Sequence, residues 1–167
     1  QRVDQLAEKI DVLAEAQSRA EQRLQRVEGD TGRLKGMILE MRYAERPYVY
    51  FKDLVRRART LESDELYDLL ERSGLTDQEL DDVIESDLVV VGRSREEDAQ
   101  TYLVAEVSWG IGPDDVERAA RRAELLSRAG QRVIPVVAGD WITPQALDAA
   151  AERRVWYVLG GRAIEPK

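Results

Sequence analysis

A seven-residue repeat of apolar side chains runs through the first forty residues and constrains this chain more than any other feature. Apolar residues dominate its first (a) and fourth (d) positions. The a positions are Val3, Ile10, Gln17, Leu24, Thr31 and Ile38, and the d positions are Leu6, Leu13, Ala20, Val27, Leu34 and Met41. A repeat this long predicts a helix that packs along a left-handed seam against another helix. Val and Ile at a with Leu at d favour two parallel helices.

Charged residues beside this seam support a parallel pair of identical helices. Arg23 of one helix would face Glu28 of the other, and Asp30 would face Lys35, so both pairs are complementary. Three glycines within residues 29–36 each cost about 0.8–1 kcal/mol of helix propensity, so we expect a weak point or bend there. The alternative is that the apolar stripe packs on the chain's own domain, but it is too long for one small domain to cover. We expect a coiled-coil homodimer.

The absence of Cys and His excludes several kinds of chemistry. A disulfide, a thiol nucleophile, a Cys/His zinc site and a Ser-His-Asp triad are all ruled out. A metal ion would need oxygen ligands, which suits Mg²⁺ or Mn²⁺. The net charge of −8 argues against non-specific nucleic-acid binding but leaves room for a local basic site. Because the chain has neither an apolar run of about 20 residues nor a signal pattern, we expect a cytoplasmic protein with no membrane partner.

Residues 42–86 predict a helical, acidic segment that leads into the core. Pro47 is expected to end or kink the long helix, because proline lacks an N–H and restricts the residue before it. The apolar spacing of residues 48–59 predicts one helix, and residues 62–72 predict a second. Thr76, with a glutamate three residues later, has the capping-box signature of a third. We interpret the many carboxylates here as a solvated face.

Residues 87–167 predict an α/β core. Strands are expected at residues 87–93, 101–108, 132–138 and 155–159, and helices at residues 114–129 and 144–152. A polar turn joins the first two strands into a hairpin, and the later strand–helix–strand order predicts parallel pairing by right-handed crossovers. Pro135 indicates an edge strand or an irregular ladder. The chain thus divides into a coiled-coil helix (1–41), a helical segment (42–86) and an α+β core (87–167) with a small mixed sheet flanked by helices.

Two carboxylates are expected at one end of the predicted hairpin. Asp87 begins the first strand and Glu106 lies near the end of the second, so pairing about the turn places them near the same end of the sheet. Two carboxylates there could hold one divalent ion, which could orient water and polarise a phosphate. The alternative is an ordinary pair of strand-end acids.

The sequence around this pair resembles a known enzyme family. D-L-V-V-V-G-R begins at Asp87, a turn and L-V-A-E-V-S follow, and an arginine-rich helix then leads to R-V-I-P-V-V-A. This arrangement resembles the PD-(D/E)XK nuclease superfamily over residues 38–160, and most of all its members with an N-terminal coiled coil. The resemblance implies a restriction-endonuclease-like domain with Mg²⁺ or Mn²⁺ bound by Asp87 and Glu106. It also implies a further acid on the first core helix, either Glu40 or Glu45.

One departure from the family pattern affects catalysis. The family's lysine, two residues after the glutamate, is Ser108 here. That lysine helps to position water and stabilises developing negative charge, whereas a hydroxyl brings no charge. Arg118, Arg121 and Arg122 on the following helix could contact the phosphates of DNA or substitute electrostatically, although arginine is a poor base. The alternative is that these arginines pair with acids of their own helix on a solvated surface.

These features predict a homodimeric nuclease-like protein with weak or altered catalysis, in which Asp87 and Glu106 hold the metal and Ser108 replaces the lysine. A second reading is a catalytically inactive nuclease-fold module that binds or scaffolds through its coiled coil. A third is a coiled-coil regulator whose α/β half recognises a protein. Trp109, directly after Ser108, is interpreted as a core side chain or as a stacking platform for bases.

Overall fold

The computed structural model describes residues 1–167 and divides them into two units, residues 1–35 and residues 36–167. One helix, α1 (Arg2–Glu45), belongs to both units and is the first of six helices. None of the six has the length and apolar character that crossing a lipid bilayer requires. α1 ends before Pro47, as predicted, but it continues without a break through the glycine-containing stretch 29–36. Glycine lowers helix propensity without removing a backbone hydrogen bond, so it weakens a helix and need not end it.

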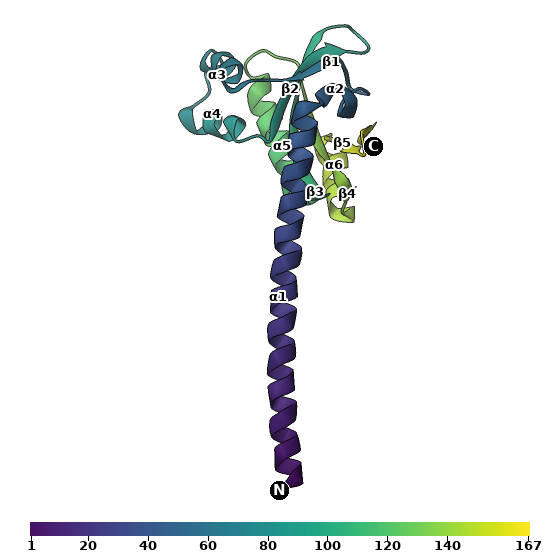
Figure 1. Cartoon of the computed structure of the whole chain (residues 1–167). Helices are drawn as coiled ribbons and strands as arrows, with labels where there is room; N and C mark the ends of the chain where they lie inside the picture. The colour runs from purple at the N-terminus through teal and green to yellow at the C-terminus, as the bar shows by residue number, and fades with distance from the viewer. The chain divides into compact units, whose positions relative to one another are not determined.

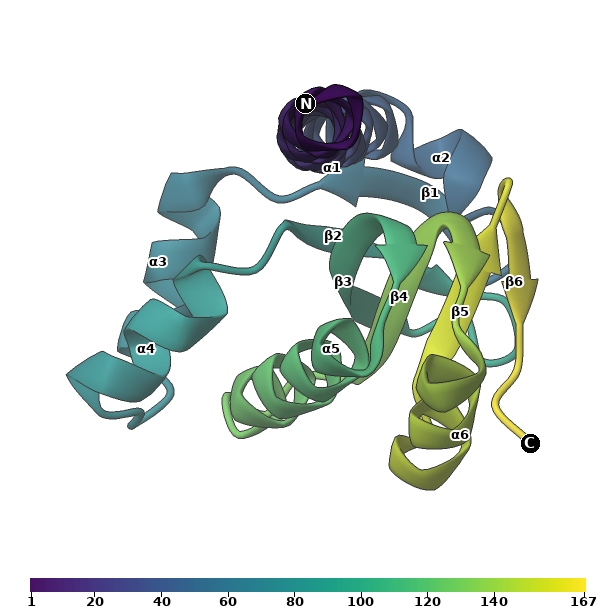
Figure 2. The same cartoon turned by 90° about the horizontal axis from the view of Figure 1, so that it is seen from below.

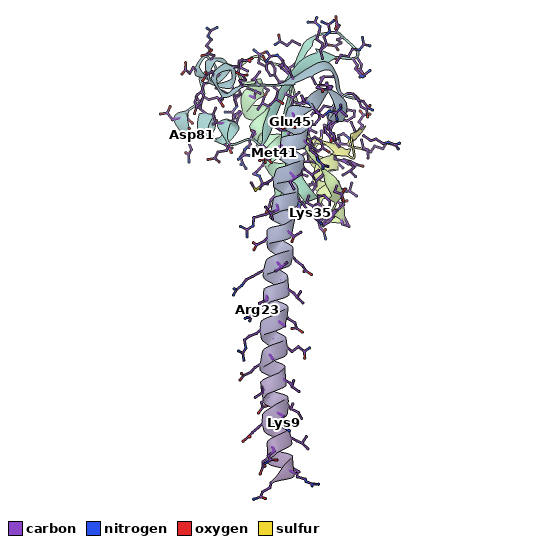
Figure 3. All side chains as sticks on the ribbon, viewed as in Figure 1. Lys9, Arg23, Lys35, Met41, Glu45 and Asp81 are labelled. Carbon is purple, nitrogen blue, oxygen red and sulfur yellow. The ribbon has the colours of Figure 1, made fainter.

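The first unit is a helix whose apolar stripe is exposed. The a and d side chains from Val3 to Leu34 include many of the chain's exposed large apolar residues. The side chains of this unit, Lys9 and Arg23 among them, project around the helix (Figure 3). Its ion pairs are exposed, so they contribute little to stability. An isolated helix that keeps this much apolar surface in water lacks the packing that normally stabilises an amphipathic helix.

The second unit is built on a mixed six-stranded sheet (Figure 1), and its strands follow one another in the order β1-β2-β3-β4-β5-β6 (Figure 2). The strands are β1 (Val55–Thr60), β2 (Leu88–Ser94), β3 (Gln100–Ile111), β4 (Val133–Ile142), β5 (Trp156–Leu159) and β6 (Arg162–Ile164). The β1–β2 and β2–β3 pairs are antiparallel, the β3–β4 and β4–β5 pairs are parallel, and β6 is antiparallel to β5. The predicted hairpin, the two parallel connections and the α+β class are therefore confirmed.

Helices cover both faces of this sheet (Figure 2). The remaining helices are α2 (Pro47–Tyr50), α3 (Ser63–Glu71), α4 (Asp77–Ile84), α5 (Pro113–Ser127) and α6 (Pro144–Arg153). On one face, Tyr43 of α1 and Phe51 pack with Leu103 and Val136 of the sheet. On the other face, α3, α4 and α5 share a core with alternate residues of β2 and β3. The α5 and α6 helices pack against β4 on that same side.

The helix predicted for residues 48–59 is wrong. α2 ends at Tyr50, and residues 55–60 form β1. Val55 and Ala58 are both buried in the core, as the apolar spacing required, but a break in the β1–β2 register places them there. Hydrogen bonding to β2 and packing against the core outweigh the local helical spacing. The middle segment is thus helical except for this edge strand.

Two further details of the sheet differ from expectation. Pro135 lies in β4, an internal strand, so the edge alternative is wrong and the alternative of an irregular ladder applies. Its pairing with β5 begins only at Val136, so Pro135 lies outside that ladder. β6 was not predicted, because three residues are too few for a periodic signal. The predicted capping box is confirmed: Glu79 N–H donates to Thr76 Oγ1 at 3.2 Å, and Thr76 N–H donates to the Glu79 carboxylate at 3.2 Å.

Candidate functional site

Asp87 and Glu106 lie together at one end of the β2–β3 hairpin. Leu88 pairs with Ala105, which places Asp87 opposite the position of Glu106. The Asp87 N–H donates to Glu106 Oε2 at 3.0 Å, and the Val107 N–H donates to Asp87 Oδ2 at 2.8 Å. The structure therefore brings together the two carboxylates selected from the sequence, and each is oriented by a backbone amide of the other's strand.

Glu106 is buried and receives two arginine side chains from α5. Only 1% of its surface is exposed. Its Oε1 accepts a hydrogen bond from Arg118 Nε at 3.2 Å and another from Arg122 Nη1. With the Asp87 N–H on Oε2, three donors hold the two carboxylate oxygens. The buried negative charge is therefore neutralised by the protein itself, as a buried ion must be.

Arg122 links this carboxylate to α4. The Arg122 side chain is 7% exposed, and its Nε donates to Asp82 Oδ1 at 3.0 Å. Its Nη1 also donates to the Glu85 carbonyl oxygen at 3.2 Å. Arg121 binds the same aspartate, with Nε 2.6 Å from Asp82 Oδ2. A continuous network of charge-assisted hydrogen bonds thus joins β3, α5 and α4.

The three arginines selected as phosphate contacts are therefore held in ion pairs. Arg118 contacts Glu106 and the carboxylate of Asp115, whereas Arg121 and Arg122 share Asp82. Only the contact with Asp115 lies within their own helix, so the same-helix alternative describes part of the arrangement. Phosphate binding by these three residues stays a prediction, and it requires the phosphate to replace carboxylates that are already in place.

Burial dominates the titration of the carboxylates. It raises the pKa of Glu106, against the Asp87 N–H and the two guanidiniums, which favour the charged form. Burial likewise raises the pKa of Asp87, against the Val107 N–H and the same guanidiniums. Glu40 on α1 has a raised pKa because it is partly buried and because Asp87 is negatively charged. Asp82 differs: the hydrogen bond from Arg121 is the largest influence and lowers its pKa.

The remaining predicted site residues are less directly engaged. Glu40 is half-buried and close enough to Asp87 to sense its charge, whereas Glu45 is exposed. The Ser108 hydroxyl donates to the Gly110 carbonyl oxygen at 3.1 Å, so it is engaged within β3 itself. Trp109 is half-buried. No group of three or more Asp and Glu side chains is arranged to hold a metal ion.

The surroundings of Glu106 suit its arginine partners better than they would suit a divalent metal ion. A metal ligand must offer a free oxygen lone pair, but three donors already occupy the Glu106 carboxylate. Two guanidiniums beside it would also repel a second cation. Asp87 and Glu40 remain as possible oxygen ligands for a metal ion, and Mg²⁺ often takes only one or two protein carboxylates. A metal site that includes Glu106 would first have to displace Arg118 and Arg122.

Asp82 is the site residue that the sequence did not reveal. It lies in a run of acids that reads as a solvated face, and its arginine partners are 39 and 40 residues away along the chain. No local pattern marks such a residue. The detectable signal was the arginine cluster of α5, two members of which, Arg121 and Arg122, bind Asp82.

Comparison with known proteins identified no relative of this chain. No protein-family model, no curated protein and no solved structure matches the chain.

Proposed function

We propose that this chain is a homodimeric, nuclease-like protein that works as a catalytically inactive binding or scaffolding module. The observation that carries this proposal is the neutralisation of Glu106 by Arg118 and Arg122. In a metal-dependent phosphodiesterase such a carboxylate would hold the ion that activates water. Here three protein donors already bind its two oxygens, and Ser108 brings no positive charge to the site.

The order of the elements supports a PD-(D/E)XK-like origin for the domain. A helix precedes three antiparallel strands, and α5 then leads to β4, which is parallel to β3. The acids lie just before the second of these strands and within the third, where the resemblance placed them. A restriction-endonuclease-like fold is therefore part of the proposal.

Pairing of two copies is supported by how α1 uses its faces within the second unit. Leu39 and Tyr43 pack into the core of the domain. The seam residues of the same turns, Ile38 at a and Met41 at d, are 50% and 60% exposed. Met41 and Glu45 can be followed along this part of α1 in Figure 3. Because the domain contacts a different face of the helix, the apolar seam remains available to a second copy in a parallel coiled coil.

Calorimetric titration with Mn²⁺ tests the proposed loss of the metal site without requiring a substrate. We expect no Mn²⁺ binding by the intact chain and none by Glu106→Ala. Arg118→Met with Arg122→Met should uncover the Glu106 carboxylate and is the variant in which Mn²⁺ binding should appear. Binding by the intact chain that disappears in Glu106→Ala would refute the inactive reading.

A metal-dependent nuclease of weak or altered activity is the second candidate function. The clustering of carboxylates favours it, because burial and, after it, the charge of Asp87 raise the pKa of Glu40, and a divalent ion would relieve that repulsion. Ser108→Lys restores the family's lysine and tests this candidate. Mg²⁺-dependent cleavage of DNA or RNA that appears or increases in Ser108→Lys supports a degraded site, and no cleavage of any substrate favours the inactive module.

A further inference from the structure

The edge strand β1 contains a bulge built by two unusual backbone features. The β1–β2 register shifts between Arg56 and Arg59, and Arg57 has a φ of 53°. A positive φ is uncommon for a residue with a side chain, and such residues cluster at functional sites. On β2, a Cβ at Gly92 would lie 2.8 Å from both Arg56 O and Val55 Cγ2. Gly92 therefore allows β1 to approach closely at the bulge.

The bulge places two arginines side by side in solvent. In a regular strand, adjacent side chains point to opposite faces of the sheet. Here Val55 and Ala58 are both buried, and the two residues between them, Arg56 and Arg57, are both exposed. Bulges redirect side chains in this way and are often found beside functional sites.

Two more cations lie at the same end of β1. The Arg95 guanidinium donates to the Lys52 carbonyl oxygen, which brings the loop after β2 to the chain before β1. Both residues are exposed. Arg56 and Arg57 form no ion pair or side-chain hydrogen bond, unlike the three arginines of α5. Together these four residues are called the β1 cationic surface.

The acids nearest to this surface are mostly committed to other partners. Asp98 accepts a hydrogen bond from Arg93 Nε at 2.9 Å, and Glu97 pairs with Arg132. Glu96 is the remaining acid of the hairpin turn, and Asp53, next to Lys52, accepts a hydrogen bond from the Ala163 N–H at 3.2 Å. Arg56 and Arg57 are close enough to Asp98 to help lower its pKa, although Arg93 is the main cause. The cations of the surface therefore outnumber the acids that are left to balance them.

We propose that the β1 cationic surface binds the phosphate backbone of nucleic acid. The planar guanidinium binds a phosphate through two hydrogen bonds. Duplex DNA carries one negative charge per about 1.7 Å of its axis, whereas an acidic peptide offers at most one per about 3.3 Å. The denser polyanion is better able to bind a local cationic surface on a chain whose net charge is −8. The proposal depends neither on the coiled coil nor on the state of Glu106.

The test is fluorescence anisotropy of a labelled mixed-sequence DNA duplex titrated with the full-length chain, at several salt concentrations. We expect Arg56→Gln with Arg57→Gln to weaken binding at least tenfold. Each lost phosphate contact should also reduce the slope of log affinity against log salt by about 1. Arg57→Gly is a second variant that removes one guanidinium and suits the positive φ, so it keeps the bulge. Its slope of log affinity against log salt should change by about half as much as that of the double variant.

The matched control is Arg72→Gln with Arg154→Gln, two exposed arginines outside the surface, which removes the same charge. Equal weakening by the control pair, or no binding by the intact chain at about 50 mM salt, overturns the proposal. Competition by poly-glutamate as strong as that by unlabelled DNA at equal charge overturns it in favour of an acidic protein partner. If the Arg56→Gln with Arg57→Gln variant keeps its affinity for DNA but aggregates in light scattering, the arginines protect the open edge of β1 against pairing with other chains.

Discussion

Glu106 and Arg122 illustrate how much a buried ion pair depends on both of its members. Almost none of either side chain is exposed. Removing one partner leaves an uncompensated buried charge, which typically costs about 3–5 kcal/mol, whereas replacing both by apolar residues is often neutral. Because Arg122 keeps Asp82 when Glu106 is removed, we expect Glu106→Leu to lower the free energy of unfolding by about 3 kcal/mol, the lower end of that range, in urea denaturation.

The double variant Glu106→Leu with Arg122→Met provides the control for this prediction. It should recover most of the stability that Glu106→Leu loses, because no unpaired charge remains at the centre of the contact. If the double variant instead loses as much stability as Glu106→Leu and Arg122→Met lose together, the two residues are not energetically coupled.

Asp82 should make the protein less stable in acid. Its folded pKa is lowered, chiefly by the hydrogen bond from Arg121, so the stability it contributes is present above its unfolded pKa. That contribution is lost as the pH falls through the lower folded pKa. We expect Asp82→Asn to cost about 1–2 kcal/mol at pH 7 and progressively less below pH 4, measured by urea denaturation across this range.

Comparison with the variant is essential here, because other carboxylates act in the opposite direction. Asp87 and Glu106 have raised pKa values, so each disfavours the folded state as the pH rises through its folded pKa. A cost of Asp82→Asn that stays constant from pH 7 to pH 3 would contradict the assignment of this acid sensitivity to Asp82.

At the scale of elements, the β1–β2 bulge depends on the glycine opposite it. A methyl group at Gly92 would meet Arg56 O and the Val55 side chain within 2.9 Å. We expect Gly92→Ala to lower the free energy of unfolding by about 1–3 kcal/mol, as overpacking does. Gly29→Ala is the control: that Cβ meets nothing within 4 Å, so the variant should raise helix stability by about 0.8–1 kcal/mol. Equal effects of the two substitutions in thermal unfolding would argue against the close approach of β1.

The bulge also explains which elements could be predicted from the sequence. Apolar runs and turn residues were sufficient for β2, β3, β4 and β5 and for the helices between them, because their side-chain periodicity is regular. In β1 the bulge separates the buried Val55 and Ala58 by three positions, which is a helical spacing. A helix was therefore predicted where the sheet has its edge strand. Local spacing cannot reveal a bulge that is formed by contact with Gly92, more than thirty residues later.

The candidate site was predictable to a similar extent. Hairpin pairing alone placed Asp87 beside Glu106, because both residues lie at a fixed distance from one turn. The arginines that neutralise Glu106 come from another element, and Asp82 comes from a third. The charge balance of a buried carboxylate depends on tertiary packing, so neither a metal nor an arginine could be assigned to it from strand positions.

For the whole molecule, two parts of the chain have different sources of stability. Residues 36–167 have their own apolar cores, centred on residues such as Phe51 and Leu103. Residues 1–35 form a helix that leaves its apolar seam exposed. Deleting residues 1–35 should therefore leave a folded domain, as judged by a cooperative thermal transition, and that domain should be monomeric in light scattering. Loss of the transition would contradict the independence of the second unit.

Adjacent residues of α1 provide a sharper test of the dimer. Leu13 at d and Val12 off the seam are almost equally exposed in the single chain, at 67% and 65%. In a coiled coil only Leu13 is buried, once in each copy. At about 1.5 kcal/mol or more for each leucine, Leu13→Asp should weaken dimerisation at least a hundredfold, whereas Val12→Asp should not. Light scattering of the full-length chains at micromolar concentration should show a monomer for the first and a dimer for the second. Equal masses for both variants would show that the seam does not join two copies.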